Sequence, residues 1–218
     1  MSKTHVYFMP GMAASSKIFE RIKLPEEHFE MHLLEWFLPE NKETLAHYAQ
    51  RMTAEIKHED AVLIGVSFGG ILVQEMARIK KFRKTIIISS VKCNTEFPMR
   101  MKLAKNTKAY KLIPTSLISH VEFLLKYGQG ELIKKRLELY KTYLSVNDKK
   151  YLDWAIENVL NWDRKQADGE IIHIHGDADE VFPAKNIKDY IRIDGGTHMM
   201  ILNRFRWFNS NLPEIILK

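Results

Sequence analysis

Short apolar runs alternate with helical patterns along most of the chain. Runs typical of buried strands cover residues 5–9, 29–36, 61–66, 85–90, 170–175 and 190–194. Between them, apolar residues recur at helical spacing, as they do from Leu45 to Ile56 after Asn41, which we expect to cap that helix. Strands that alternate with helices usually form a parallel sheet covered on both faces. The pattern therefore predicts an α/β fold with a mostly parallel sheet and helices on both sides.

The alternation stops in the middle of the chain. From residue 95 to residue 164, helical patterns dominate and no strand is predicted. We therefore expect a core made of residues 1–94 and 165–218, with a helical insertion at residues 95–164 between two of its strands.

Two further helices are expected in the core. One covers residues 69–79, directly after the third strand. The other carries the apolar stripe Phe205, Phe208 and Leu212 near the end of the chain. Pro213 falls within that pattern and has no backbone N–H, so we expect it to kink the helix or begin a final turn.

Length and composition are those of a globular protein. The 218 residues suit one domain with an insertion, and 45% hydrophobic with 28% charged residues is an ordinary balance. The single cysteine, Cys93, excludes an internal disulfide and agrees with a reducing compartment. The apolar run near the N-terminus is four residues long, too short for a signal peptide, and no run approaches a membrane span. We expect a cytoplasmic protein.

The positive charge is concentrated in one segment. The net charge is +6, and residues 99–150 contain 12 Lys and Arg against 4 Asp and Glu. A basic segment on a nearly neutral body indicates either an anionic substrate or partner there, or a solvated helical face rich in lysine. No nucleic-acid recognition motif accompanies this charge, so nucleic-acid binding is not expected.

The motif G-V-S-F-G, residues 65–69, directly follows a buried strand and opens a helix. A sharp turn of this kind forces its central residue into a strained conformation and exposes its side chain at the carboxyl edge of the sheet. Ser67 is therefore a candidate nucleophile. The alternative is a glycine-rich turn with an incidental serine.

A serine hydroxyl needs a base and an orienting carboxylate. His198, in G-G-T-H-M-M, lies between the last strand and the last helix, where a loop can reach Ser67 across the sheet edge. The stretch H-G-D-A-D-E-V-F-P offers three acids, Asp177, Asp179 and Glu180, and its position alone does not choose among them.

Two other histidines lie on the strand before this acidic stretch. His175, beside Gly176, looks structural. His173 and His175 alternate on the strand, but neither an H-E-x-x-H pattern nor a Cys–His cluster accompanies them. No metal site is therefore predicted.

These three motifs, in this order, resemble the α/β-hydrolase family. G-V-S-F-G looks like its nucleophile elbow, H-G-D-A-D-E-V-F-P like its acid loop, with the pattern H-G-x-x-D-x-x-x-P, and G-G-T-H-M like its histidine loop. The pattern assigns the acid to Asp179, four residues before Pro183, with Asp177 second. The resemblance covers nearly the whole chain. It implies a Ser67–His198–Asp179 triad and, because the two extra strands that begin many members are missing here, a sheet of about six strands.

The resemblance also interprets the first turn and the insertion. In the family, the turn after the strand that corresponds to residues 5–9 supplies an oxyanion-hole amide, which implies that the N–H groups of Met12 and Phe68 would bind the oxyanion. Pro10 replaces the usual histidine, and a plain Pro-Gly turn is the alternative. The insertion lies where family members carry a cap that covers the active site and shapes its pocket.

The function that the resemblance implies is a serine hydrolase. It would cleave a carboxylic ester or thioester of a small molecule through an acyl-enzyme, without a cofactor or metal. A second interpretation is a triad-based lyase or thioesterase, since a basic cap would suit an anionic, CoA-linked or carrier-protein-linked substrate. A third is a non-catalytic small-molecule receptor on the same fold. The sequence predicts no oligomeric state.

Overall fold

The structure is a computed structural model that describes residues 3–112, 142–143, 148–167 and 170–218. Residues 113–141 and 144–147 of the expected helical insertion lie outside the described residues. Within the described residues, no helix is both long enough and apolar enough to cross a membrane.

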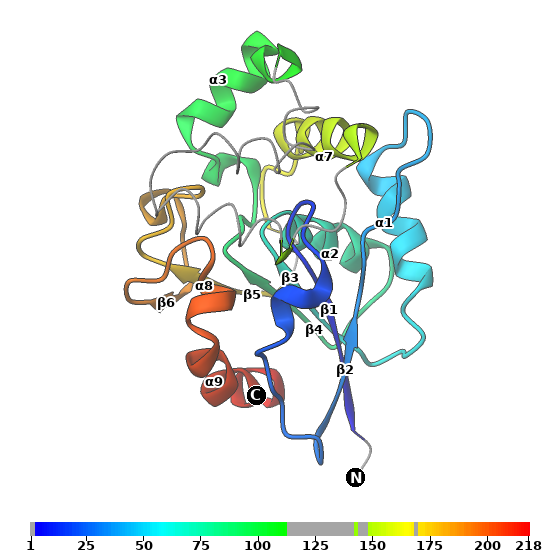
Figure 1. Cartoon of the computed structure of the whole chain (residues 1–218), viewed down its shortest axis with the longest axis vertical. Helices are drawn as coiled ribbons and strands as arrows, with labels where there is room; N and C mark the ends of the chain where they lie inside the picture. Colours follow the sequence, from blue (N-terminus) through cyan, green and yellow to red (C-terminus); the bar gives the residue numbers. More distant parts are fainter. Residues whose placement is uncertain (1–2, 113–141, 144–147, 168–169) are drawn as a thin grey trace.

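Six parallel strands form one sheet in the order β2-β1-β3-β4-β5-β6 (Figure 1). The strands are β1 (Thr4–Met9), β2 (Phe29–Leu33), β3 (Val62–Val66), β4 (Lys84–Ile88), β5 (Ile171–Gly176) and β6 (Ile191–Ile193). Every residue of β3 is buried, as expected for a central strand covered on both faces. The predicted six-stranded parallel sheet is confirmed.

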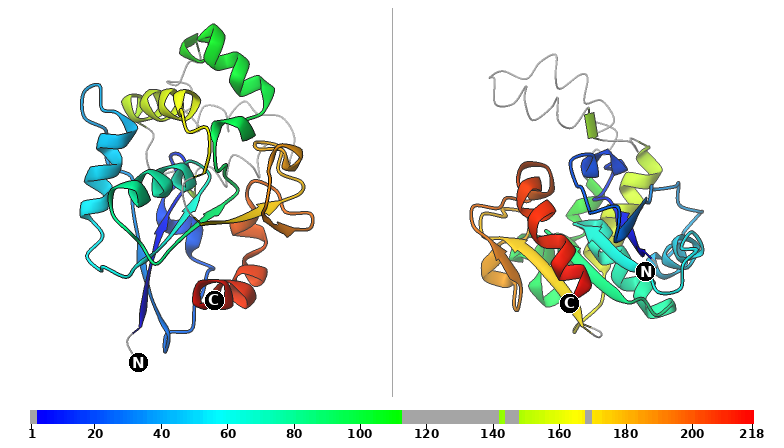
Figure 2. Two further views of the ribbon diagram at one scale, coloured as in Figure 1. Left: turned by 180° about the vertical axis from the view of Figure 1, so that it is seen from behind. Right: turned by 90° about the horizontal axis from the view of Figure 1, so that it is seen from below.

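Helices cover both faces of the sheet (Figure 2). The helices and 3-10 turns are η1 (Ser16–Phe19), α1 (Leu45–Ala54), α2 (Phe68–Ile79), η2 (Asn94–Glu96), α3 (Met99–Thr107), η3 (Ala109–Leu112), α7 (Lys149–Asn161), η4 (Ala184–Asn186), α8 (Met200–Asn203) and α9 (Phe205–Leu217). Because strand side chains alternate between faces, Tyr7 and Met9 pack with α1, α2 and α7, whereas Val6 and Phe8 pack with η1, α8 and α9.

Helix α7, at the end of the expected insertion, is anchored in the core by aromatic side chains. Tyr151 and Trp154 of α7 lie in one buried cluster with Trp36, Tyr48 and Phe68. The Trp36 ring stacks on Phe68 at 5.0 Å, and the Tyr48 and Trp154 ring centroids are 4.4 Å apart. Because Phe68 directly follows Ser67, this cluster connects the insertion to the turn that carries the candidate nucleophile.

Two strands end two or three residues earlier than the sequence predicts. The strand expected over residues 29–36 ends at Leu33, and beyond it the Trp36 indole turns inward to donate to the carbonyl of Gly11 at 2.7 Å. The strand expected over residues 85–90 ends at Ile88, because Ser89 has a φ of +48° and leaves the extended conformation.

Two helix ends also differ from the prediction. The cap of α1 is Thr44 and not Asn41, since the Thr44 hydroxyl accepts from the backbone N–H of His47 at 3.2 Å. Helix α9 continues through Pro213 to Leu217, so this proline neither ends the helix nor begins a separate turn. Its missing N–H leaves the carbonyl of Asn209 without its usual helical donor.

The hydroxyl of Tyr48 joins α1 to the loop after β2. It accepts from the N–H of Phe37 at 3.1 Å and donates to the carbonyl of Phe37 at 2.9 Å. Tyr48→Phe removes both bonds, and we expect the free energy of unfolding to fall by about 1–2 kcal/mol, measured by urea titration. Tyr143→Phe is the control, because its hydroxyl donates to Glu20 at the surface, and we expect a loss below about 0.5 kcal/mol. Equal losses in the two variants would contradict this prediction.

Candidate active site

Ser67 lies in a strained turn between β3 and α2. Its φ is +53° and its ψ is −118°, in a region that non-glycine residues rarely adopt. Its N–H donates to the carbonyl of Ile88 at 2.9 Å, and its own carbonyl accepts from the Ser90 hydroxyl at 2.7 Å. The strained conformation is the one that the strand–turn–helix motif predicts, and bonds to the end of β4 and the segment after it hold the residue in place.

Glycines allow the turn after β1 to lie directly against this turn. A Cβ atom at Gly69 would collide with the carbonyl oxygen of Pro10, and one at Gly65 would collide with the backbone of Gly69. A Cβ atom at Gly11 would lie 3.5 Å from the Cβ of Ser67. The segment that contains Met12 is therefore adjacent to Ser67.

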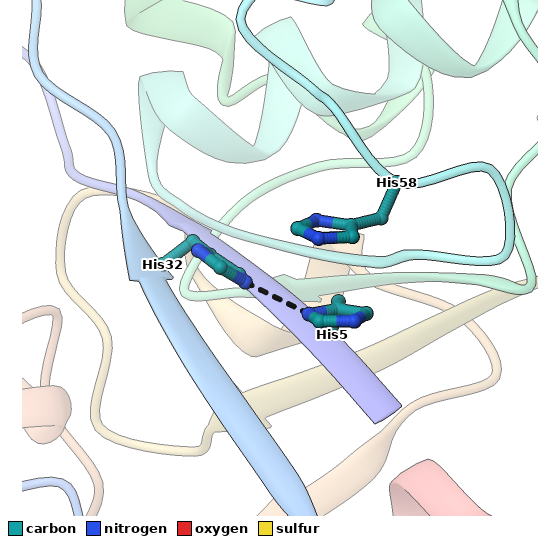
Figure 3. Close-up of side chains that lie close together, drawn as sticks. All are labelled: His5, His32 and His58. Atoms are coloured by element: carbon teal, nitrogen blue, oxygen red, sulfur yellow. Dashed lines mark hydrogen bonds between the residues drawn. The ribbon is translucent and has the colours of Figure 1, made fainter. Parts of the chain in front are cut away.

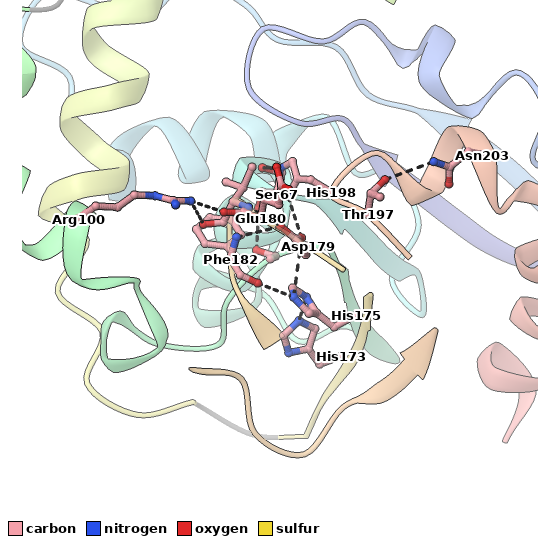
Figure 4. A network of polar contacts seen from close by, with 12 residues as sticks. Ser67, Arg100, His173, His175, Asp179, Glu180, Phe182, Thr197, His198 and Asn203 are labelled. Atoms are coloured by element: carbon pink, nitrogen blue, oxygen red, sulfur yellow. Dashed lines mark hydrogen bonds and ion pairs between the residues drawn. The ribbon is translucent and has the colours of Figure 1, made fainter. Parts of the chain in front are cut away.

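His198 lies between Ser67 and Asp179 (Figure 4). It belongs to the loop between β6 and α8, and its side chain is 21% exposed. Its Nε2 is 3.0 Å from the Ser67 Oγ, and its Nδ1 is 2.9 Å from Oδ2 of Asp179. A proton on Nδ1 is donated to the carboxylate, which leaves Nε2 free to accept the serine proton.

Of the three acids in the loop after β5, Asp179 contacts His198. Its side chain is fully buried, and its Oδ1 accepts from the N–H groups of Val181 and Phe182 at 2.8 and 2.9 Å. These two bonds fix the carboxylate, so that Oδ2 points at the imidazole.

The other two acids lie elsewhere. Asp177 accepts from Arg192 and from the N–H of Gly195, both at 2.7 Å, and Glu180 is exposed. Asp177 therefore holds the loop that leads to His198 without contacting the imidazole. The family pattern ranks Asp179 before Asp177, and Asp179 is the aspartate that lies next to His198.

Two buried histidines lie behind the acid. His175 Nε2 donates to the carbonyl of Phe182 at 2.8 Å and lies 3.7 Å from Oδ2 of Asp179. His173 Nε2 is 3.2 Å from Nδ1 of His175. Burial lowers the pKa of both imidazoles, so both rings are neutral at pH 7. His175 holds the loop through the carbonyl of Phe182, and His173 supports His175, in agreement with a structural role for His175.

The basic helix α3 contacts the same loop. Arg100 donates to the carbonyls of Glu180 and Val181, next to Asp179. Lys102 donates to the carbonyl of Thr95 at 2.9 Å, and Lys111 pairs with Glu157 at 3.6 Å. Part of the positive charge in the basic segment therefore makes contacts within the chain, at its surface.

The turn after β1 is held by bonds that no local sequence pattern indicates. Trp36 donates to the carbonyl of Gly11 at 2.7 Å, and the N–H of Ala13 donates to the Tyr151 hydroxyl at 3.1 Å. Within the described residues, the N–H groups of Met12 and Phe68 have no hydrogen-bond acceptor. Phe68 is the first residue of α2, where the helix dipole favours negative charge.

No protein-family model and no curated protein matches the sequence. Solved structures resemble the fold over almost its whole length. A thermophilic esterase from Thermogutta terrifontis is 12% identical, with a TM-score of 0.69 over 99% of this chain and 90% of that one. A hydrolase from Pseudomonas aeruginosa is 13% identical (TM-score 0.67, 99% and 90%), and a bromoperoxidase from Bacillus anthracis is 14% identical (0.65, 99% and 92%). Together with the strand order, these likenesses show that the chain has the α/β-hydrolase fold.

Proposed function

We propose that the protein is a serine hydrolase that cleaves a carboxylic ester or thioester of a small molecule. The observation that carries this proposal is the continuous line of contacts from the Ser67 hydroxyl through His198 to Asp179, at 3.0 and 2.9 Å. A hydroxyl, an imidazole and a buried carboxylate in this arrangement are the parts that nucleophilic acyl transfer needs. The likeness of the fold to esterases and hydrolases supports the same reaction class.

In the first half of the reaction, the Ser67 Oγ attacks the carbonyl carbon of the substrate. His198 Nε2 takes the hydroxyl proton as the new C–O bond forms, and then gives it to the leaving alcohol or thiol. Asp179 keeps the Nδ1–H tautomer in place and stabilises the imidazolium. Its buried carboxylate is suited to this role because two backbone amides already hold its other oxygen.

The second half of the reaction is hydrolysis of the acyl-enzyme. A water molecule gives its proton to His198 Nε2 and attacks the acyl carbon, and the proton then returns to Ser67 Oγ as the acid leaves. In both halves negative charge develops on the carbonyl oxygen. The N–H groups of Met12 and Phe68 are the donors we assign to it, because both flank Ser67 and neither has another acceptor within the described residues.

The first test is Ser67→Ala, compared with Ser210→Ala on the exposed surface of α9 as the matched control. We expect a fluorophosphonate probe to label the wild type and the control but not Ser67→Ala. Turnover of p-nitrophenyl acetate should fall by at least about 10⁴-fold in Ser67→Ala, because the nucleophile is lost. A folded wild type that neither reacts with the probe nor turns over nitrophenyl esters of any acyl length would refute the proposal.

The second test compares the two aspartates. Asp179→Asn should lower kcat for p-nitrophenyl acetate by about 10³–10⁴-fold, because an amide cannot stabilise the imidazolium or keep its tautomer. Asp177→Asn should lower it by less than about 10-fold, because the Asp177 carboxylate bonds to Arg192 and to the N–H of Gly195 and does not contact His198. The opposite ranking in steady-state kinetics would move the acid role to Asp177.

A further inference from the structure

Three histidines meet on the sheet face that α1 covers (Figure 3). His5 is on β1, His32 is on β2, and His58 is in the loop between α1 and β3. In the pairing of β1 with β2, His32 lies opposite Tyr7 and Glu30 lies opposite His5. His5 is near the amino end of β1, whereas Ser67 follows the carboxyl end of β3, so this cluster is separate from the candidate active site.

Nitrogens of the three rings lie close together. His5 Nδ1 is 3.0 Å from His32 Nε2, and one nitrogen from each of the three rings lies within 4.8 Å of the others. The rings of His5 and His58 are stacked, with centroids 3.4 Å apart. Two imidazole nitrogens this close repel each other through their lone pairs unless a proton or a cation lies between them.

A carboxylate lies beside the same two nitrogens. Oε2 of Glu30 is 3.7 Å from His5 Nδ1, and Oε1 is 3.7 Å from His32 Nε2. Three imidazoles and one carboxylate are a donor set that suits Zn²⁺ and other first-row divalent ions.

The third ring is oriented by a neighbouring hydroxyl. His58 Nδ1 is 2.7 Å from the Tyr7 hydroxyl, which also accepts from the N–H of Lys57 at 3.3 Å. When His58 donates its Nδ1–H to that oxygen, the lone pair of Nε2 is left for a ligand. Metal-binding histidines commonly use their second nitrogen in this way, because the bond fixes the orientation of the ring.

We propose that His5, His32 and His58, with Glu30 as the fourth ligand, bind one divalent first-row transition-metal ion such as Zn²⁺. Tetrahedral coordination at the usual Zn–N distance needs about 3.3 Å between ligand nitrogens, close to the 3.0 Å between His5 and His32. The stacked ring of His58 must rotate off His5, because its Nε2 lone pair lies in the ring plane and has to point at the ion. The side chains of His5 and His32 are 27% and 23% exposed, so an ion has access to the cluster.

The ion would connect three segments that are far apart in the sequence. It would join β1 to the edge strand β2, and both to the loop after α1. An ion that binds only the folded chain raises the melting temperature. The site is structural and does not depend on the proposed hydrolase activity.

The test is zinc binding by the full-length chain without an affinity tag, measured by isothermal titration calorimetry with zinc chloride alone. We expect one ion per chain with a Kd in the micromolar range or tighter. His32→Gln and His58→Gln should each weaken binding by about 100-fold or more, because each removes a ligand. His28→Gln, which removes an exposed histidine just before β2, is the matched control and should bind as the wild type does.

Two further measurements on the wild type keep the proposal testable if a variant fails to fold. Zinc at about 100-fold above its Kd should raise the melting temperature by about 5–10 °C. X-ray absorption at the zinc edge should show imidazole ligands at about 2.0 Å. The absence of zinc binding, a zinc spectrum without imidazole ligands, or unchanged affinity in His32→Gln and His58→Gln would each overturn the proposal.

Discussion

A close backbone contact beside the candidate nucleophile joins the turn after β1 to the turn after β3. It exists because residue 69 has no side chain, and the carbonyl of Pro10 occupies the space where a Cβ atom would be. The contact fixes Ser67 between two central strands and brings the Met12 amide beside it. The proposed mechanism needs His198 and the Met12 amide within reach of the Ser67 hydroxyl, and this contact helps to hold the serine at that position.

A second backbone contact does the same for His198 and Asp179. The end of β5 at Gly176 passes so close to Gly196 that a Cβ atom would collide with the Gly196 carbonyl. This contact ties the strand that leads to Asp179 to the loop that carries His198. Two glycine contacts therefore position the backbone segments that carry Ser67, His198 and Asp179. Side-chain hydrogen bonds then connect these three residues.

Local sequence patterns were sufficient to predict the features that depend on residues close together in the sequence. The central strands, the turn at Ser67 and the position of His198 follow from short apolar runs and from residues that are close in the sequence. Strand and helix ends were less certain, because they depend on single events such as the positive φ of Ser89 or the hydroxyl of Thr44. The choice of Asp179 as the aspartate beside His198 required the family pattern, because Asp177 and Asp179 lie in the same turn and differ in what they contact after folding.

The residues that the sequence did not indicate are those whose partners are distant. Trp36 and Tyr151 hold the turn after β1 from positions 25 and 138 residues further along the chain. The three histidines near the start of β1 lie 27 and 26 positions apart along the chain, so no motif spacing unites them. Only the pairing of β1 with β2 and the path of the loop after α1 bring them together.

The described ends of the expected insertion contact the core loops that lie beside Ser67 and Asp179. Tyr151 of α7 accepts a bond from the turn that contains Met12, and Arg100 of α3 donates to the loop that contains Asp179. The segment is therefore not an interchangeable module. Replacing it would also release two backbone loops, one next to Ser67 and one that contains Asp179, so the sequence of the insertion and the line of contacts between these residues cannot change independently of each other.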